Sequence, residues 1–299
     1  MFNLNDHIFR LLQSEPFFAA LSRKVEKRAN KAIPTAGVRV NPDTGYFEMV
    51  YNPDFFEGLT DNQRSGVLIH EFYHLVFEHV TGRLPDELAG VMKGQPTQEE
   101  ARKFKLWNIA ADLSINFHIG ASNLPDNCCI PGGPQFEDLP GNMTAEWYFD
   151  ALKKKVEESD QGDGGGEGGD GEGQSGGSGQ GDPGEASGNG GFDPDKAGQF
   201  DSHDDWGGEA CDAATEEIAK ERLREAMREA TNEASSKGWG TVSASTRREI
   251  IDKLSSKVDW RKVLRWFVKC SQRANKRSTP RRLNKRYAYI HPGRKIERL

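Results

Sequence analysis

Two histidines and a glutamate stand within five residues of one another, at His70, Glu71 and His74. Residues four apart on an α-helix differ by about 40° in direction and about 6 Å in height, so both imidazole rings can face one ion. Glu71 lies about 100° round the helix from His70, where its carboxylate reaches a water molecule on that ion. This H-E-x-x-H spacing is typical of zinc sites that hydrolyse peptide bonds. It predicts a Zn2+ site with Glu71 as the general base.

The residues on either side of the motif, 67–69 and 75–77, are uncharged. A helix with such flanks packs in a core and turns its metal-binding face toward a cleft. The alternative is a core helix whose histidines form hydrogen bonds with backbone carbonyls. Two buried histidines and a buried glutamate without a metal would leave several polar groups to satisfy, so the metal site is favoured.

A catalytic zinc ion takes three protein ligands and keeps one position for water. Asp112 is the favoured third ligand, because it is an acid in the middle of an apolar helix and a divalent ion would neutralise it. In the alternative, Asp112 pairs with Arg83. His79 is a second candidate, although on a continuous helix it lies about 140° from His74. It approaches the ion only if the helix unwinds before Glu78.

Three further residues are candidates for supporting roles. Asn108 and Asn116 flank Asp112 at intervals of four and form a polar stripe with it, which predicts that they orient the aspartate or the histidines. His203 lies in the segment 200–206, directly after a glycine-rich stretch. It is a candidate extra ligand or oxyanion-stabilising group, and the alternative is that this segment only anchors the chain.

The N-terminal elements must position these residues. Residues 5–32 have the apolar spacing of two consecutive helices, and residues 38–51 have the pattern of a β-hairpin. The hairpin offers an edge strand on which an extended peptide substrate can pair. Thr60 and Gln63 form a capping-box pattern that begins the motif helix, and Gly82 is its predicted end. The later helices are expected at 98–119, from 144 to 152, at 212–236 and at 260–270.

The 299 residues carry a net charge of −6, which averages an acidic stretch and a basic C-terminus. Composition predicts a metallopeptidase domain at 1–157, an acidic glycine-rich disordered linker at 158–198, and a helical basic segment at 199–299 that packs on the first domain. The four cysteines form no C-x-x-C pair and suggest no disulfide framework, which predicts reduced thiols. No leader pattern or long apolar run is present, so we expect a cytoplasmic protein with no membrane span.

These segments together resemble the family described as putative metallopeptidase domain proteins. The resemblance is carried by IPTAGVRV, YNPDFF, LIHEFYHLVFEHVTGR, WNIAADLSIN, TAEWYFDAL, DSHDDW, DWRKVLRWFVK and PRRLNKRY. It implies a zincin-like fold and a zinc ion on His70 and His74. It also implies Glu71 as the catalytic base and Asp112 as the third ligand.

Relatives in that family continue into a von Willebrand factor A-like domain, whereas this chain ends at Leu299 and has no D-x-S-x-S pattern. We therefore expect the partner function of such a domain to come from another chain or to be absent. The predicted fold class is α+β, zincin-like and mainly helical, with a small N-terminal β-hairpin or sheet beside the motif helix.

The predicted function is that of a zinc-dependent metallopeptidase acting on a polypeptide. One alternative is a catalytically silent metal-binding module that partners an A-like domain protein or an ATPase. Another is a nucleic-acid-associated protein that binds through its basic tail.

Overall fold

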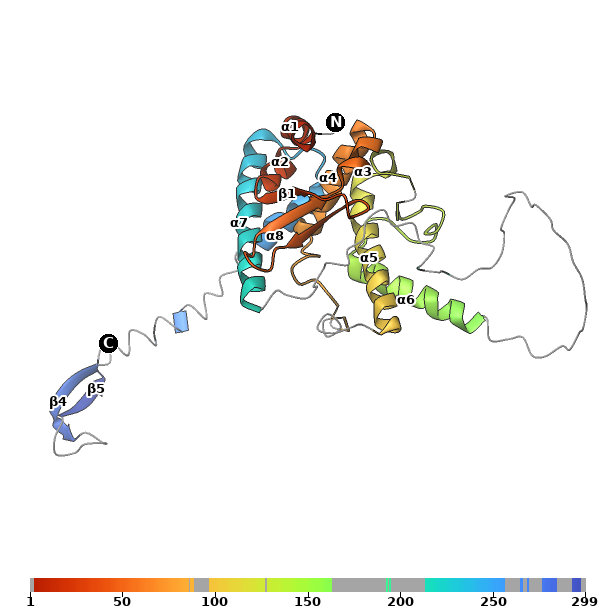
Figure 1. Cartoon of the computed structure of the whole chain (residues 1–299). Coiled ribbons are helices and arrows are strands. Elements are labelled where there is room, and N and C mark those ends of the chain that lie inside the picture. The colour runs from red at the N-terminus through yellow and green to blue at the C-terminus, as the bar shows by residue number, and fades with distance from the viewer. Residues whose placement is uncertain are drawn as a thin grey trace, which may run out of the picture. The chain divides into compact units, whose positions relative to one another are not determined.

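The computed structural model describes residues 3–85, 87–88, 97–126, 128–162, 192, 194, 213–255, 264–265, 268, 276–283 and 292–296 (Figure 1). The chain divides into two compact units, Met1–Ile251 and Asp252–Leu299. The first unit contains the H-E-x-x-H motif. The described part is mainly helical with a small three-stranded sheet, so the α+β class predicted from the sequence is confirmed.

The N-terminal residues form two short helices, α1 (Leu4–Ser14) and α2 (Pro16–Ser22). Asn3 caps α1, and Pro16 occupies the first turn of α2, where its missing N–H costs nothing. The prediction of two consecutive helices is correct up to Ser22 but wrong beyond it. The chain enters strand β1 (Val25–Ala29), because pairing with another strand overrides the local helical spacing.

The sheet has the order β1-β3-β2. Strand β2 (Ala36–Val40) runs antiparallel to β3 (Phe47–Tyr51), as the predicted hairpin requires, and β1 runs parallel to β3. Among the described residues β2 is therefore an edge strand, and it packs against the motif helix. The hairpin could be predicted from its turn, whereas the parallel partner joins residues far apart in sequence.

Helix α3 (Pro53–Gly58) leads into α4 (Asp61–Val76), which carries the motif. Every residue of α4 from Gly66 to Val76 is buried, as is the middle of α5 (Gln98–Ile119). A helix that is buried all round must be packed on several sides. α4 contacts α1, α2, β2, α5 and the 3-10 turn Ala121–Asn123.

Helix α6 (Ala145–Gly162) packs against α5 over a core that includes Trp107, Tyr148 and Phe149. It continues past Leu152, where the sequence predicted its end, into the first residues of the predicted linker. Near the other end of that linker, Phe192 packs on this core, with its ring centroid 5.8 Å from that of Phe136. Packing an aromatic side chain on an apolar surface is favourable even where the neighbouring residues in the sequence are polar.

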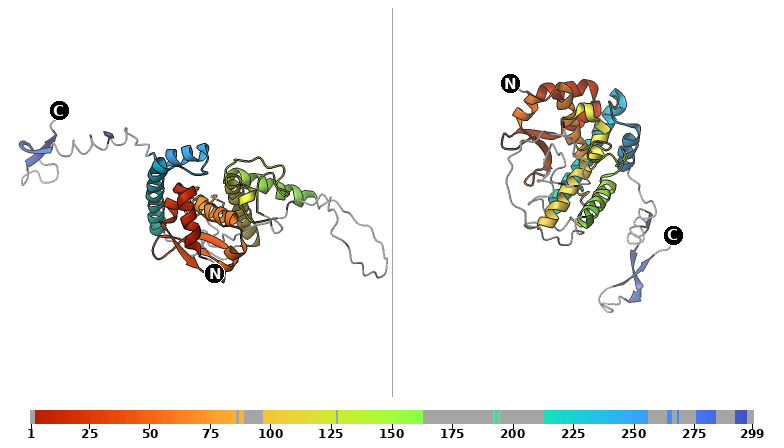
Figure 2. Two further views of the ribbon diagram at one scale, coloured as in Figure 1. Left: turned by 90° about the horizontal axis from the view of Figure 1, so that it is seen from above. Right: turned by 90° about the vertical axis from the view of Figure 1, so that its right-hand side faces the viewer.

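The first unit also contains α7 (Ala213–Lys237) and most of α8 (Ala244–Leu254), up to Ile251 (Figure 2). α7 packs against α2 through small and apolar residues on one face, and its other faces are charged. The predicted helix at 212–236 agrees with α7.

The second unit contains an antiparallel pair of strands, β4 (Lys276–Leu283) and β5 (Pro292–Ile296). The sequence predicted a helix followed by an irregular terminus here. Most of that helix, residues 260–270, lies outside the described residues, and the irregular terminus proves to contain the strand pair. Among the described residues, no helix combines the length and the apolar character needed to cross a membrane.

Candidate metal centre

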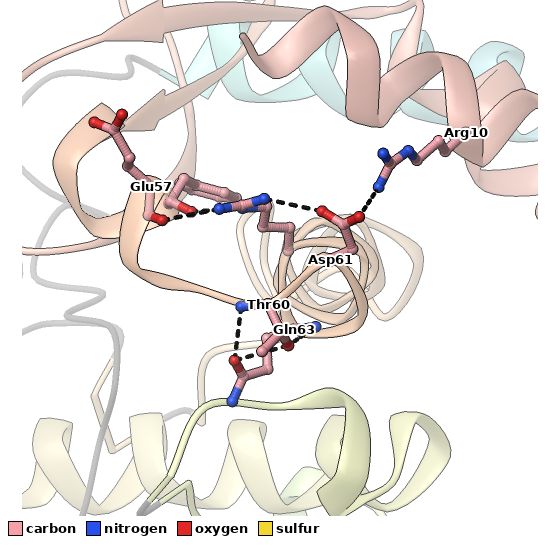
Figure 3. A network of polar contacts seen from close by, with 7 residues as sticks. Arg10, Glu57, Thr60, Asp61 and Gln63 are labelled. Atoms are coloured by element: carbon pink, nitrogen blue, oxygen red, sulfur yellow. Dashed lines mark hydrogen bonds and ion pairs between the residues drawn. The ribbon is translucent and has the colours of Figure 1, made fainter. Parts of the chain in front are cut away.

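The start of α4 is fixed by a network of polar contacts (Figure 3). The Thr60 N–H donates to Gln63 Oε1 at 3.0 Å and the Gln63 N–H donates to Thr60 Oγ1 at 3.3 Å, so the predicted capping box is confirmed. Asp61 accepts from Arg64 at 2.9 Å and also pairs with Arg10 of α1. The Arg10 guanidinium holds the pKa of Asp61 below its ordinary value. These contacts fix the position of α4 along its axis.

His70 and His74 lie one turn apart on α4, and both side chains are fully buried. Their Nε2 atoms are 2.8 Å apart. Imidazole nitrogens that face each other at this distance without a shared proton or cation would repel, so a positive centre between them is favourable. Glu71, between them in sequence, is also buried.

Helix α5 brings Asp112 to the same point. Its Oδ1 lies 3.7 Å from His70 Nε2 and 3.5 Å from His74 Nε2, and one ligand atom from each of the three residues lies within 4.8 Å of the other two. Zinc bonds of about 2.0–2.2 Å in tetrahedral geometry place neighbouring ligand atoms about 3.4 Å apart. The observed separations bracket that value, so two nitrogens and one carboxylate oxygen fit a divalent ion.

The other ring nitrogen of His70 has its own partner. His70 Nδ1 lies 2.8 Å from Asn116 Oδ1, and Asn116 Nδ2 donates to the carbonyl oxygen of Cys129 at 2.9 Å. The Cys129 contact fixes which way the amide points, so Oδ1 accepts from an Nδ1–H on His70. His70 Nε2 then carries the lone pair toward Asp112 and His74. The sequence predicts that Asn116 orients Asp112 or a histidine, and the structure places its amide oxygen on the His70 ring.

His79 lies next to His74 because α4 ends at Val76, well before the predicted stop at Gly82. Its side chain is buried, and its Nδ1 lies 3.1 Å from His74 Nδ1. That nitrogen of His74 is on the opposite side of the ring from the one that faces Asp112. His79 therefore contacts a candidate ligand and is not in the group of three.

Asn108 lies one turn before Asp112 on α5 and is buried. Its Oδ1 has no hydrogen-bond partner among the described residues. Asn116 therefore has a described contact with a candidate ligand, whereas Asn108 has none. A buried amide oxygen in this state is a candidate for contact with water or substrate.

The other ionisable groups near the motif have different roles. Arg83, the alternative partner of Asp112, forms two hydrogen bonds with Glu146, at 2.5 and 3.0 Å. Burial raises the pKa of the Tyr73 hydroxyl above its ordinary value. His118 stacks on Tyr73 at 5.8 Å, and burial lowers its pKa. It lines a cavity of about 200 Å3 on the Phe77 side of α4.

Sequence reasoning did not identify the Cys129 carbonyl oxygen that holds Asn116. No sequence signal could have indicated it, because every residue carries a backbone carbonyl and only the fold selects one. The sequence also gave no strong signal for the turn that places His79 beside His74. In this turn Glu78 has a positive φ, and glycine is the usual residue at such a position after a helix. His203 lies outside the described residues.

Comparison with known proteins identifies a family and a relative. The model of the family described as "Putative metallopeptidase domain" matches residues 3–297. An "Uncharacterized protein" of Thermotoga maritima is 24% identical over 270 residues, which are 86% of this chain and 56% of that protein. The chain thus spans little more than half the length of this relative. No solved structure matches.

Proposed function

Because this chain belongs to the putative metallopeptidase domain family, we propose that it hydrolyses peptide bonds with a zinc ion held by His70, His74 and Asp112. One observation carries the proposal. The Nε2 atoms of both histidines and the Asp112 carboxylate converge from two buried helices, with the three ligand atoms within 4.8 Å of one another. Metal ligands supplied by two packed helices, here α4 and α5, suit a zincin-like domain.

When bound, zinc supplies a Lewis acid that polarises the scissile carbonyl and makes water a stronger nucleophile near neutral pH. The residues of the chain do the rest. Glu71 accepts a proton from the attacking water and then gives it to the leaving amine nitrogen. Asn116 holds the His70 ring in place through its contact at 2.8 Å. Burial of the site keeps bulk water away from the charges that form.

Two nitrogens and one carboxylate also suit other ions, including ferrous iron in oxygenases. The choice of zinc rests on Glu71, which stands next to the first ligand as the H-E-x-x-H mechanism requires. Metal analysis of the purified protein tests the choice directly. One zinc per chain is expected.

A polypeptide substrate suits the edge of the sheet. In the part of the chain that the structure describes, β2 pairs with β3 on one side and has no strand on the other, and it lies against α4. An extended peptide that pairs with β2 would be held mainly through its backbone, which makes recognition tolerant of side-chain sequence. We therefore propose an unfolded or extended protein segment as the substrate class.

The test is Glu71→Gln, which keeps the size of the side chain but removes the base. We expect full zinc content, an unchanged melting temperature, and a loss of about 10²–10⁴-fold in cleavage of an unfolded protein. The control is Glu57→Gln, a change in helix α3 outside the motif, which should retain wild-type cleavage.

The competing function is a metal-binding module without turnover, since a structural zinc site does not need Glu71. Wild-type protein with one zinc and no cleavage across a broad peptide library would support that function instead. Partnership with a von Willebrand factor A-like protein, an ATPase or nucleic acid stays a prediction from the sequence, as do the cytoplasmic location and a site role for His203.

A further inference from the structure

The end of α4 is a Schellman motif. The His79 N–H donates to the carbonyl oxygen of His74 at 2.9 Å, and the Glu78 N–H donates to that of Leu75 at 3.0 Å. Glu78 has a φ of 62°, the left-handed conformation that this motif needs at the residue after the helix cap. The motif reverses the chain and places the side chain of its last residue over the helix residue five positions earlier.

In Schellman motifs an apolar contact frequently joins those positions. Here they are His79 and His74, and the contact is polar. Their Nδ1 atoms are 3.1 Å apart and their ring centroids are 5.2 Å apart at 61°. The rings of Phe77 and Trp107 pack around the buried His79 ring, with their centroids 5.9 and 6.1 Å from its centroid.

We infer that His79 is a positioning residue for the proposed metal site. Its Nδ1 accepts a hydrogen bond from the Nδ1–H of His74, which selects the tautomer whose Nε2 lone pair faces Asp112 and His70. Asn116 does the same for His70 from the other helix. Each of the two candidate histidine ligands thus has one nitrogen on the metal side and one held by a protein acceptor. The inference rests on the proposed metal site but not on turnover.

The geometry separates this role from that of a ligand. On His74, the nitrogen that contacts His79 is Nδ1, whereas the nitrogen that faces His70 and Asp112 is Nε2. A ligand must reach the Nε2 side. His79 instead acts through His74, as residues behind metal-bound histidines do when they set ring orientation and basicity.

Two substitutions test the inference in the full-length chain. His79→Asn places its Oδ1 at the same number of bonds from Cβ as the histidine Nδ1, so it keeps the acceptor. His79→Phe keeps the ring that packs on Phe77 and Trp107 but removes both nitrogens. We expect zinc affinity, measured by competition with a chromophoric chelator, to fall about 10–100-fold in His79→Phe. His79→Asn should bind zinc close to the wild-type level.

Equal zinc affinity in wild type and His79→Phe would overturn the inference. Loss of zinc stoichiometry in both variants would also overturn it, because His79 would then be a ligand. A third measurement needs no variant to fold. In the zinc-loaded wild-type chain labelled with 15N-histidine, the His79 ring should carry its proton on Nε2, and a proton on Nδ1 would contradict the assignment. If zinc binds as predicted but nothing is cleaved, only the proposed function fails.

Discussion

At the scale of single residues, the site depends on how each histidine uses its two nitrogens. His70 and His74 turn their Nε2 atoms to a common point, and their Nδ1 atoms contact Asn116 and His79. The spacing of the motif accounts for the shared direction of the two Nε2 atoms, because residues four apart share a helix face. The contacts of the two Nδ1 atoms depend on which groups the fold places on that side of each ring.

Zinc should stabilise the folded protein, and this stabilisation should require Asp112. Zinc at about 100 times its dissociation constant should raise the free energy of unfolding by about 2.7 kcal/mol, and a chelator should remove this gain. Asp112→Asn should lose most of the gain, since the carboxylate oxygen lies 3.5 Å from His74 Nε2. Calorimetry with and without zinc measures both. Glu71→Gln is the control that should keep the full effect, and an undiminished gain in Asp112→Asn would exclude it as a ligand.

At the scale of elements, α4 is held at both ends and along its length. The capping box and Arg10 fix its start, and the Schellman motif ends it. Gly66 allows the 3-10 turn Ala121–Asn123 to lie directly on the helix, because a Cβ there would come 1.7 Å from the Asn123 carbonyl oxygen. A helix fixed in this way can hold two ligands without reorganising.

Gly66→Ala should therefore destabilise the protein, although alanine favours helices. Overpacking against backbone typically costs about 1–3 kcal/mol, more than the roughly 1 kcal/mol that alanine gains in a helix interior. Chemical denaturation measures the change. The matched control is Gly58→Ala at the end of α3, where an added Cβ has no heavy atom within 4 Å. If both substitutions proved neutral, the close contact would not be a constraint on α4.

At the scale of the whole molecule, segments far apart in sequence complete the first unit. Trp239 stacks on Phe17 with centroids 5.3 Å apart, and the Thr241 N–H donates to Glu15 at 2.8 Å. The face of α7 that packs on α2 is buried, and its buried residues are Ala219, Leu223, Ala226, Met227, Ala230 and Ala234. Residues 1–157 alone would leave the side of α2 that faces α7 uncovered.

The two parts of the unit should stay together after the chain is cut. With a protease site placed between residues 170 and 180, we expect both fragments to co-elute in gel filtration after cleavage, because the α2–α7 contact is mainly apolar. Trp239→Ala should weaken the association, whereas Arg224→Ala, on the exposed side of α7, should not. Fragments that separate while each stays folded would show that α7 is dispensable.

The local features were predictable from sequence because each depends on neighbouring residues. The capping box, the β-hairpin and the helical spacing of the motif all belong to this class. Strand β1 was missed because its partner β3 lies about 20 residues further on. The end of α4 was misplaced because the turn uses a glutamate with positive φ where glycine is usual.

The sequence by itself determined which chemical groups are available: two imidazoles on one helix face, a carboxylate beside them, and an acid in a second apolar helix. Only the tertiary structure decided which atoms meet. It brought Asp112 to the histidines, placed Arg83 on Glu146 instead, and set Asn116 and His79 behind the rings. The physical reason is that spacing along one helix fixes direction within that helix, whereas contacts between elements depend on packing that no short segment encodes.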